Sequence, residues 1–101
     1  MIDHVGFEVA DLERSAVFYD AVFGALGGRR VHEGPHAIAY GTHEPRFWIV
    51  IRGRRPAPGY GHVALLARGR AAVAGAHRAA LASGGRDDGA PALRPLYGPL
   101  Y

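Results

Sequence analysis

Apolar and polar side chains alternate over residues 2–9, as they do in a strand with one buried face. Val5, Phe7 and Val9 form the apolar set of this stretch, and Ile2 falls on the other face. Because successive side chains of a strand point to opposite faces, His4 and Glu8 would lie on the face away from the apolar set. The pattern therefore predicts a first strand whose apolar side packs beneath a helix.

The period changes to that of a helix after Asp11, with apolar side chains every three or four residues up to Leu26. Asp11 is a residue type that caps helix N-termini. Gly27 and Gly28 follow the last apolar position, and glycine readily adopts the left-handed conformation that ends helices. We therefore expect one amphipathic helix between Asp11 and the double glycine.

Three short strands are expected next, over residues 29–33, 36–41 and 46–52, with turns at Gly34-Pro35 and at residues 42–45. The third stretch, RFWIVIR, is the strongest of the three strand candidates. Residues 53–61 are rich in Gly and Pro, which disfavour a central strand, and they are interpreted as a linker.

The second half begins like the first. A strand is expected over residues 62–67, an Ala-rich helix over 70–83, and a stop at Gly84-Gly85. The interval from His62 to this double glycine is one residue shorter than the matching interval from His4, and we assign the difference to the loop between strand and helix. This recurrence predicts an internal repeat.

Too few residues follow Gly85 for three further strands, so we expect an incomplete, C-terminally truncated second module with an exposed sheet edge.

The amino-acid composition mainly excludes certain kinds of chemistry and location. The 101 residues include no cysteine, which excludes disulfides and thiolate chemistry, and no apolar run long enough to span a bilayer. No secretory signal is recognised at the N-terminus, so we expect a cytoplasmic protein without membrane contact. The formal net charge is +3. The densest basic cluster, Arg52, Arg54 and Arg55, lacks interleaved aromatic residues, so we interpret it as a solvated loop rather than a nucleic-acid site.

Residues 2–27, IDHVGFEVADLERSAVFYDAVFGALG, resemble the opening of the vicinal-oxygen-chelate superfamily, which includes glyoxalases, bleomycin-resistance proteins and extradiol dioxygenases. The family pattern is a strand bearing His, followed by Asp-Leu, Ser, Phe-Tyr and Leu-Gly. The matching residues are His4, Asp11 and Leu12, Ser15, Phe18 and Tyr19, and Leu26 and Gly27. Residues 61–91 resemble the second module of the same family.

The resemblance implies an α+β fold of paired β-α-β-β-β modules, in which a curled mixed sheet surrounds a cavity and two helices lie outside. Residues 1–52 would form the first module, 53–61 the linker and 62–101 the partial second module of a single glyoxalase-like domain. Because pairing covers free sheet edges and two-fold assemblies are common, a homodimer is expected.

The resemblance also implies a divalent metal held by a His from the first strand of each module and a Glu from the last strand. His4 and His62 match the two His positions, and the Glu would lie beyond Tyr101. Two His and one carboxylate would suit Fe(II), Mn(II), Ni(II) or Zn(II). The alternative is that both His only line a cavity. Glu8 shares the face of His4 but lies roughly 13 Å along the strand, so we interpret it as solvated or salt-bridged.

Candidate substrate-binding residues are aromatic. Trp48 and Val50 alternate with Phe47, Ile49 and Ile51 along the expected strand, so one of these two sets would face the cavity. Trp48 is our choice for a pocket residue and Tyr40 is a further candidate, because ligand pockets are commonly lined by aromatic side chains. Tyr97 lies in the Pro-rich tail and could edge the pocket. The remaining histidines interpreted as ordinary surface residues are His32, His43 and His77.

Three functional hypotheses follow. The first is a metal-dependent enzyme in which the ion polarises vicinal oxygens of a small substrate, in a lyase, isomerase or dioxygenase reaction. The second is a metal-free protein of the bleomycin-resistance type that sequesters a drug or another small molecule. The third is an inactive truncated fragment.

Overall fold

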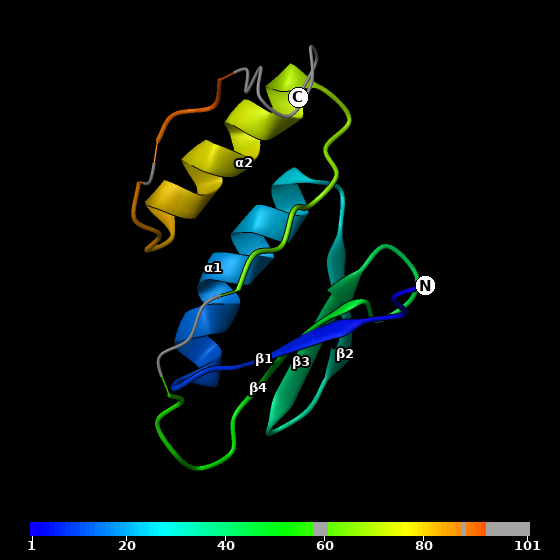
Figure 1. Cartoon of the computed structure of the whole chain (residues 1–101), viewed down its shortest axis with the longest axis vertical. Coiled ribbons are helices and arrows are strands. Elements are labelled where there is room, and N and C mark those ends of the chain that lie inside the picture. The colour runs from blue at the N-terminus through cyan, green and yellow to red at the C-terminus, as the bar shows by residue number, and fades with distance from the viewer. Residues whose placement is uncertain (58–60, 88, 93–101) are drawn as a thin grey trace.

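The computed structural model describes residues 1–57, 61–87 and 89–92. Its elements, shown in Figure 1, are β1 (Val5–Glu8), α1 (Leu12–Ala25), β2 (Arg29–Glu33), β3 (Ala37–Gly41), β4 (Phe47–Val50) and α2 (Arg70–Ala82). The four strands form one sheet in the order β1-β4-β3-β2, in which β1 and β4 are parallel and the other two pairs antiparallel. The expected α+β class, with a mixed sheet and two helices, is confirmed.

The core lies between α1 and one face of the sheet. Its buried residues are Ala16, Phe23, Ile38, Tyr40, Phe47 and Ile49. As predicted, Val5, Phe7 and Val9 pack against this core. The predicted N-cap is also observed, because the Asp11 carboxylate accepts a hydrogen bond from the Arg14 amide at 3.1 Å. This packing leaves the opposite face of the sheet free of helices within the described residues.

A bulge in β2 sends two nearby side chains to opposite faces of the sheet. Arg30 is paired with Tyr40, whereas His32 is paired with Ala39, so the register shifts between these two positions. Arg30 consequently lies on the α1 side, where its guanidinium donates two hydrogen bonds of 2.7 Å to the Asp20 carboxylate. His32 lies on the other side of the sheet, whereas a strand without a bulge would place residues 30 and 32 on the same face.

The two helices end in the same way. The Gly28 amide donates to the Phe23 carbonyl at 2.7 Å, and the Gly85 amide donates to the Ala80 carbonyl at 2.8 Å. The preceding glycine of each pair has a positive φ, 86° in α1 and 102° in α2. The expected glycine stops are therefore confirmed. The intervals from His4 to the α1 N-cap and from His62 to the α2 N-cap are equal, while α1 has 14 residues and α2 has 13, so the one-residue difference lies in the helix and not in the loop.

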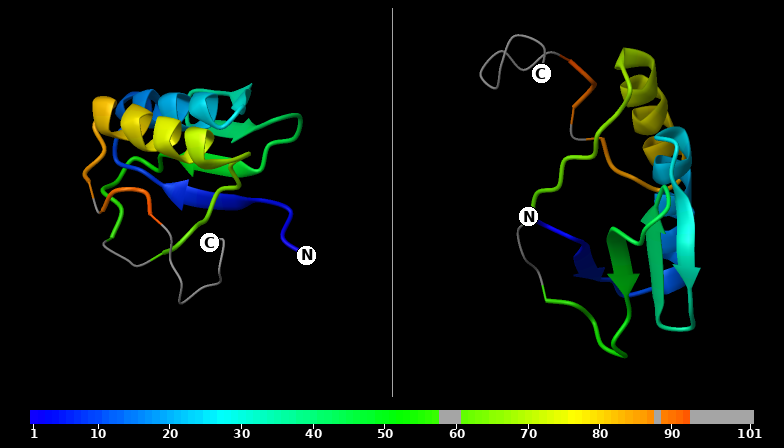
Figure 2. Two further views of the ribbon diagram at one scale, coloured as in Figure 1. Left: turned by 90° about the horizontal axis from the view of Figure 1, so that it is seen from above. Right: turned by 90° about the vertical axis from the view of Figure 1, so that its right-hand side faces the viewer.

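Helix α2 packs on α1 and contacts no strand, and none of its residues is buried. Figure 2 shows both helices on one side of the sheet in its left view. The segment 61–67 is not a strand, contrary to expectation. Val63 and Leu65 instead line a hollow together with Tyr19 and Val22 of α1, and both remain partly exposed. A strand also needs a hydrogen-bonded neighbour, and the described residues provide none for this segment.

No helix within residues 1–57, 61–87 and 89–92 has the length and apolar character needed to cross a membrane.

Candidate functional site

Four residues form a row across the sheet face that α1 leaves free. In strand order they are Gly6, Trp48, Ala39 and His32. The rings of Trp48 and His32 lie with their centroids 5.1 Å apart, and Ala39 between them is completely buried. Gly6 offers no side chain on the other flank of Trp48. The row therefore closes over Ala39 and stays open beside Gly6.

This opening is part of a hollow of about 530 Å³, which we call the sheet-face hollow. Its lining residues are His4, Gly6, Phe7, Glu8, Trp48, Val50, Arg52 and Arg54. Strand alternation explains most of the set, because Trp48, Val50 and Arg52 are spaced two residues apart along β4 and its extension, and Phe7, which packs on the α1 side, is the exception. The hollow combines an indole wall, an imidazole and two guanidinium groups, a composition suited to holding a small molecule.

An ion pair between Glu8 and Arg54 bounds the hollow on one side. The Arg54 guanidinium donates hydrogen bonds of 2.9 and 3.4 Å to the two Glu8 oxygens. These hydrogen bonds lower the pKa of Glu8, against the opposing effect of desolvation, and Arg52 adds a smaller electrostatic contribution in the same direction. The interpretation of Glu8 as salt-bridged is therefore confirmed.

The same ion pair separates the sheet-face hollow from a second one of about 570 Å³. Gly6, Phe7, Glu8 and Arg54 line both hollows, and the second also includes Arg55. Arg54 is carried by the loop after β4, directly after Gly53, whose φ is 69°. The two hollows are therefore neighbours that share the ion pair as part of their lining.

His4 lies at the end of the hollow nearer the N-terminus. Its Nδ1 atom is 2.9 Å from Asp3 Oδ1, and the other Asp3 oxygen accepts a hydrogen bond of 3.1 Å from Arg46. The hydrogen bond with His4, followed by the charge of Arg46, lowers the pKa of Asp3. Asp3 thus holds the His4 ring at the edge of the hollow.

His62 does not line the hollow with His4; it is exposed in the segment 61–67. Across the described residues, no three His, Asp or Glu side chains are grouped so that they could hold a metal ion. The carboxylate of Glu8 is already engaged by Arg54. Within the described residues, His4 and His62 are therefore not brought into one hollow, and the Glu of the implied ligand set is expected outside these residues.

The aromatic candidates are placed differently from one another. Trp48 lines the hollow, whereas Tyr40 is fully buried on the α1 side, and its hydroxyl donates to Asp20 at 2.8 Å. The expectation that Tyr40 lines the cavity is thus corrected: it is paired with Phe47 across β3 and β4, and both rings face the helix. Tyr97 lies outside the described residues.

Sequence reasoning missed the position of the loop arginines at the hollow. His32 is exposed, as expected of a surface residue, and the bulge, which leaves no clear signal in the sequence, brings its ring beside Trp48. Arg52 and Arg54 were noted as a cluster, and the alternation of β4 continued to position 52 could have placed Arg52 on the same sheet face as Trp48. His77 lies on α2 as expected and contacts Asp87 at 3.2 Å.

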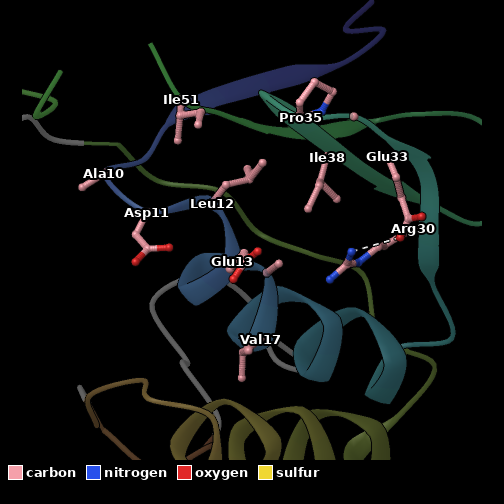
Figure 3. Close-up of a pocket in the computed structure, with 12 residues that line it drawn as sticks. Ala10, Asp11, Leu12, Glu13, Val17, Arg30, Glu33, Pro35, Ile38 and Ile51 are labelled. Atoms are coloured by element: carbon pink, nitrogen blue, oxygen red, sulfur yellow. Dashed lines mark hydrogen bonds and ion pairs between the residues drawn. The ribbon is translucent and has the colours of Figure 1, made fainter. Parts of the chain in front are cut away.

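A larger hollow of about 890 Å³ lies on the α1 side, between the first turn of α1 and the β2–β3 turn (Figure 3). Apolar Leu12 and Ile38 line it together with acidic side chains. Asp11 there caps α1, and Glu33 is paired with Arg30 at 3.0 Å. Because Asp11 and Glu33 already serve the fold, and Glu13 alone of the lining carboxylates has neither an ion pair nor a side-chain hydrogen bond within the described residues, this hollow is the weaker candidate for a functional site.

Comparison of the chain with family models and with curated proteins finds no match.

Proposed function

We propose that this chain is a domain of the vicinal-oxygen-chelate type that binds a small molecule in the sheet-face hollow. The element order β1-α1-β2-β3-β4 agrees with one module of that family. The matched glycine ends of α1 and α2 support an internal repeat. The choice of this family is based on the sequence resemblance over residues 2–27 and 61–91.

The observation that carries the binding function is the gap at Gly6 beside Trp48. Elsewhere in the row, a large ring covers a small neighbour, but Gly6 is exposed, and among the described residues no side chain covers the strand there. Ligand sites commonly combine an aromatic surface with a few polar groups that fix orientation. His4 and Arg52 supply such groups at the margins of this hollow.

Nuclear magnetic resonance of the 15N-labelled chain tests the proposal with a library of small aromatic fragments. We expect binding fragments to shift the amide signals of Gly6 and Glu8 and the indole signal of Trp48. The proposal fails when no fragment shifts these signals, or when all shifts gather around Val17 and Arg30 in the hollow of Figure 3.

A metal-dependent enzyme is the second candidate, and the position of His4 in the hollow favours it. His4 and His62 would hold a divalent ion such as Fe(II), Mn(II), Ni(II) or Zn(II) together with a carboxylate. The ion would act as a Lewis acid toward vicinal oxygens of a small substrate. This candidate requires His62 to approach His4, which the arrangement of the segment 61–67 does not provide.

Calorimetric titration with Ni²⁺ and Zn²⁺ separates the two candidates. A metalloenzyme requires binding that is lost in both His4→Ala and His62→Ala. Fragment binding that persists in a chelator, with no metal uptake by the wild-type chain, supports the metal-free binding protein instead.

A further inference from the structure

The sheet-face hollow carries excess positive charge. Of the described residues that line it, Glu8 alone has a carboxylate, and Arg54 already neutralises that carboxylate. Arg52 forms no ion pair within the described part of the chain. One guanidinium thus faces a hollow whose remaining wall is largely apolar, with Trp48 and Val50 beside it.

We propose that the ligand of this hollow is a planar organic carboxylate, with its ring on Trp48 and its carboxylate held by Arg52 and Arg54. Without ligand, the Glu8 carboxylate forms the ion pair with Arg54, and the ligand carboxylate replaces it on binding. This inference rests on the proposed binding function and adds the chemical class of the ligand.

The geometry of the Glu8 contact supports the choice of a carboxylate. Arg54 presents two donors to the two oxygens of Glu8, which is how a guanidinium recognises a carboxylate group. The lowered pKa of Glu8 agrees with this contact. A ligand carboxylate in the hollow would accept hydrogen bonds from the same two N–H groups of Arg54.

The position of the arginines also suits a ligand of this shape. Trp48 and Arg52 are two same-face steps apart on β4 and its extension, which is roughly 13 Å at the backbone. A long Arg52 side chain can reach back over part of that distance. An aromatic ring on the indole would therefore direct a carboxylate toward the guanidinium groups.

Exchange of Glu8 for a ligand carboxylate demands little of the fold. The Arg54 side chain is 69% exposed and the Glu8 side chain 19%, so Arg54 can leave the pair from its solvent side while Glu8 stays at the wall of the hollow. Gly53, with φ of 69°, precedes Arg54 in a loop outside the sheet. Arg54 can therefore change partner without disturbing the core between α1 and the sheet.

The probes for a test are 2-naphthoate and its neutral amide, 2-naphthamide, which have the same ring system. We expect naphthoate to bind at least tenfold more tightly than naphthamide, with signal shifts at Gly6 and Trp48. Arg52→Met and Arg54→Met should each reduce the naphthoate affinity toward that of the amide. Arg55→Met is the matched control, because it removes the same charge from the same loop but does not line the sheet-face hollow.

Glu8 gives two further readouts. Glu8→Gln should raise the naphthoate affinity severalfold and leave the naphthamide affinity unchanged, because it frees Arg54. In the wild-type chain, bound naphthoate should raise the pKa of the Glu8 carboxyl, measured by 13C titration, because Arg54 has turned to the ligand. A Glu8→Gln variant with unchanged or weaker naphthoate binding contradicts the exchange.

The outcomes separate this inference from the proposed function. Equal binding of both probes in the hollow overturns the carboxylate proposal and leaves small-molecule binding intact. Absence of any shift in the hollow with either probe overturns both. Shifts confined to residues 52–55 with a single-stranded oligonucleotide, together with no response to naphthoate, would assign the arginines to nucleic acid and also overturn the proposal.

Discussion

Trp48 stands directly opposite Gly6 in the parallel register of β1 and β4, and this pair shapes the free face of the sheet. A side chain in place of the glycine would meet Trp48 at once, since a Cβ atom there would lie 3.7 Å from the Trp48 Cβ. That distance is an ordinary contact, so the strand itself does not require glycine. The missing side chain matters for the hollow and not for the backbone.

Gly6→Val should therefore close the hollow without unfolding the chain. Gly6 does not have a positive φ, and a β-branched residue suits a strand, so we expect the free energy of unfolding to change by less than about 1 kcal/mol. Binding of 2-naphthoate should weaken at least tenfold. Urea unfolding and probe titration measure the two effects separately.

The control for Gly6→Val is Gly41→Ala. A Cβ atom at Gly41 would collide with the Glu44 carbonyl oxygen, so this variant should lose stability whatever happens in the hollow. Full probe affinity in a folded Gly6→Val protein would show that the ligand binds elsewhere.

Tyr40→Phe should lower the stability and leave probe binding unchanged. The Tyr40 hydroxyl is on the α1 side, where it donates to Asp20 at 2.8 Å, and loss of one such hydrogen bond costs about 1 kcal/mol. Urea unfolding measures the stability, and naphthoate titration measures binding. Unchanged stability combined with lost naphthoate binding would mean that Tyr40 belongs to the ligand site.

Local signals in the sequence predicted much of the fold. The span of β2 was predicted as residues 29–33, and Asp11 and the two double glycines marked helix ends that the structure confirms. Each of these signals acts within a few residues of chain. Capping and left-handed glycines need no distant partner, so they can be recognised from sequence alone.

The departures from prediction depend on distant pairing. The face of Tyr40 follows from its pairing with Phe47 in β4, and the contact of the exposed His32 with Trp48 follows from a bulge in β2 that no local pattern marks. Val63 and Leu65 alternate as strand residues do, yet a strand forms only beside another strand. The candidate site was predicted in part, through His4 and Trp48, whereas the contact of Arg54 with Glu8 joins a loop to a distant strand.

Asp20 should make the stability depend on acidic pH. Hydrogen bonds from Arg30, and more weakly from Tyr40, lower the Asp20 pKa against desolvation. A lowered pKa means that this contribution is complete above the unfolded-state value of about 4 and is lost as pH falls through the folded-state value. The Asp20 side chain is 44% exposed, so solvent screening keeps the contribution modest.

Urea unfolding at several pH values below 6 checks this expectation. Asp20→Asn should be less stable than the wild type at neutral pH, and the difference should shrink as the solution becomes more acidic. Glu13→Gln is the control, because Glu13 forms no ion pair within the described residues. A difference that stays constant with pH would mean that Asp20 acts through packing alone.

Gly85→Ala should destabilise the contact between the two helices. A Cβ atom at Gly85 would lie 2.7 Å from a Phe18 ring carbon and 2.8 Å from the Ala80 carbonyl oxygen, and such crowding costs about 1–3 kcal/mol. Gly84→Ala is the matched comparison, since its cost of about 1–2 kcal/mol comes from the positive φ alone. Combining Gly85→Ala with Phe18→Ala should recover part of the loss in urea unfolding. Strictly additive losses would mean that Phe18 does not contact Gly85 in solution.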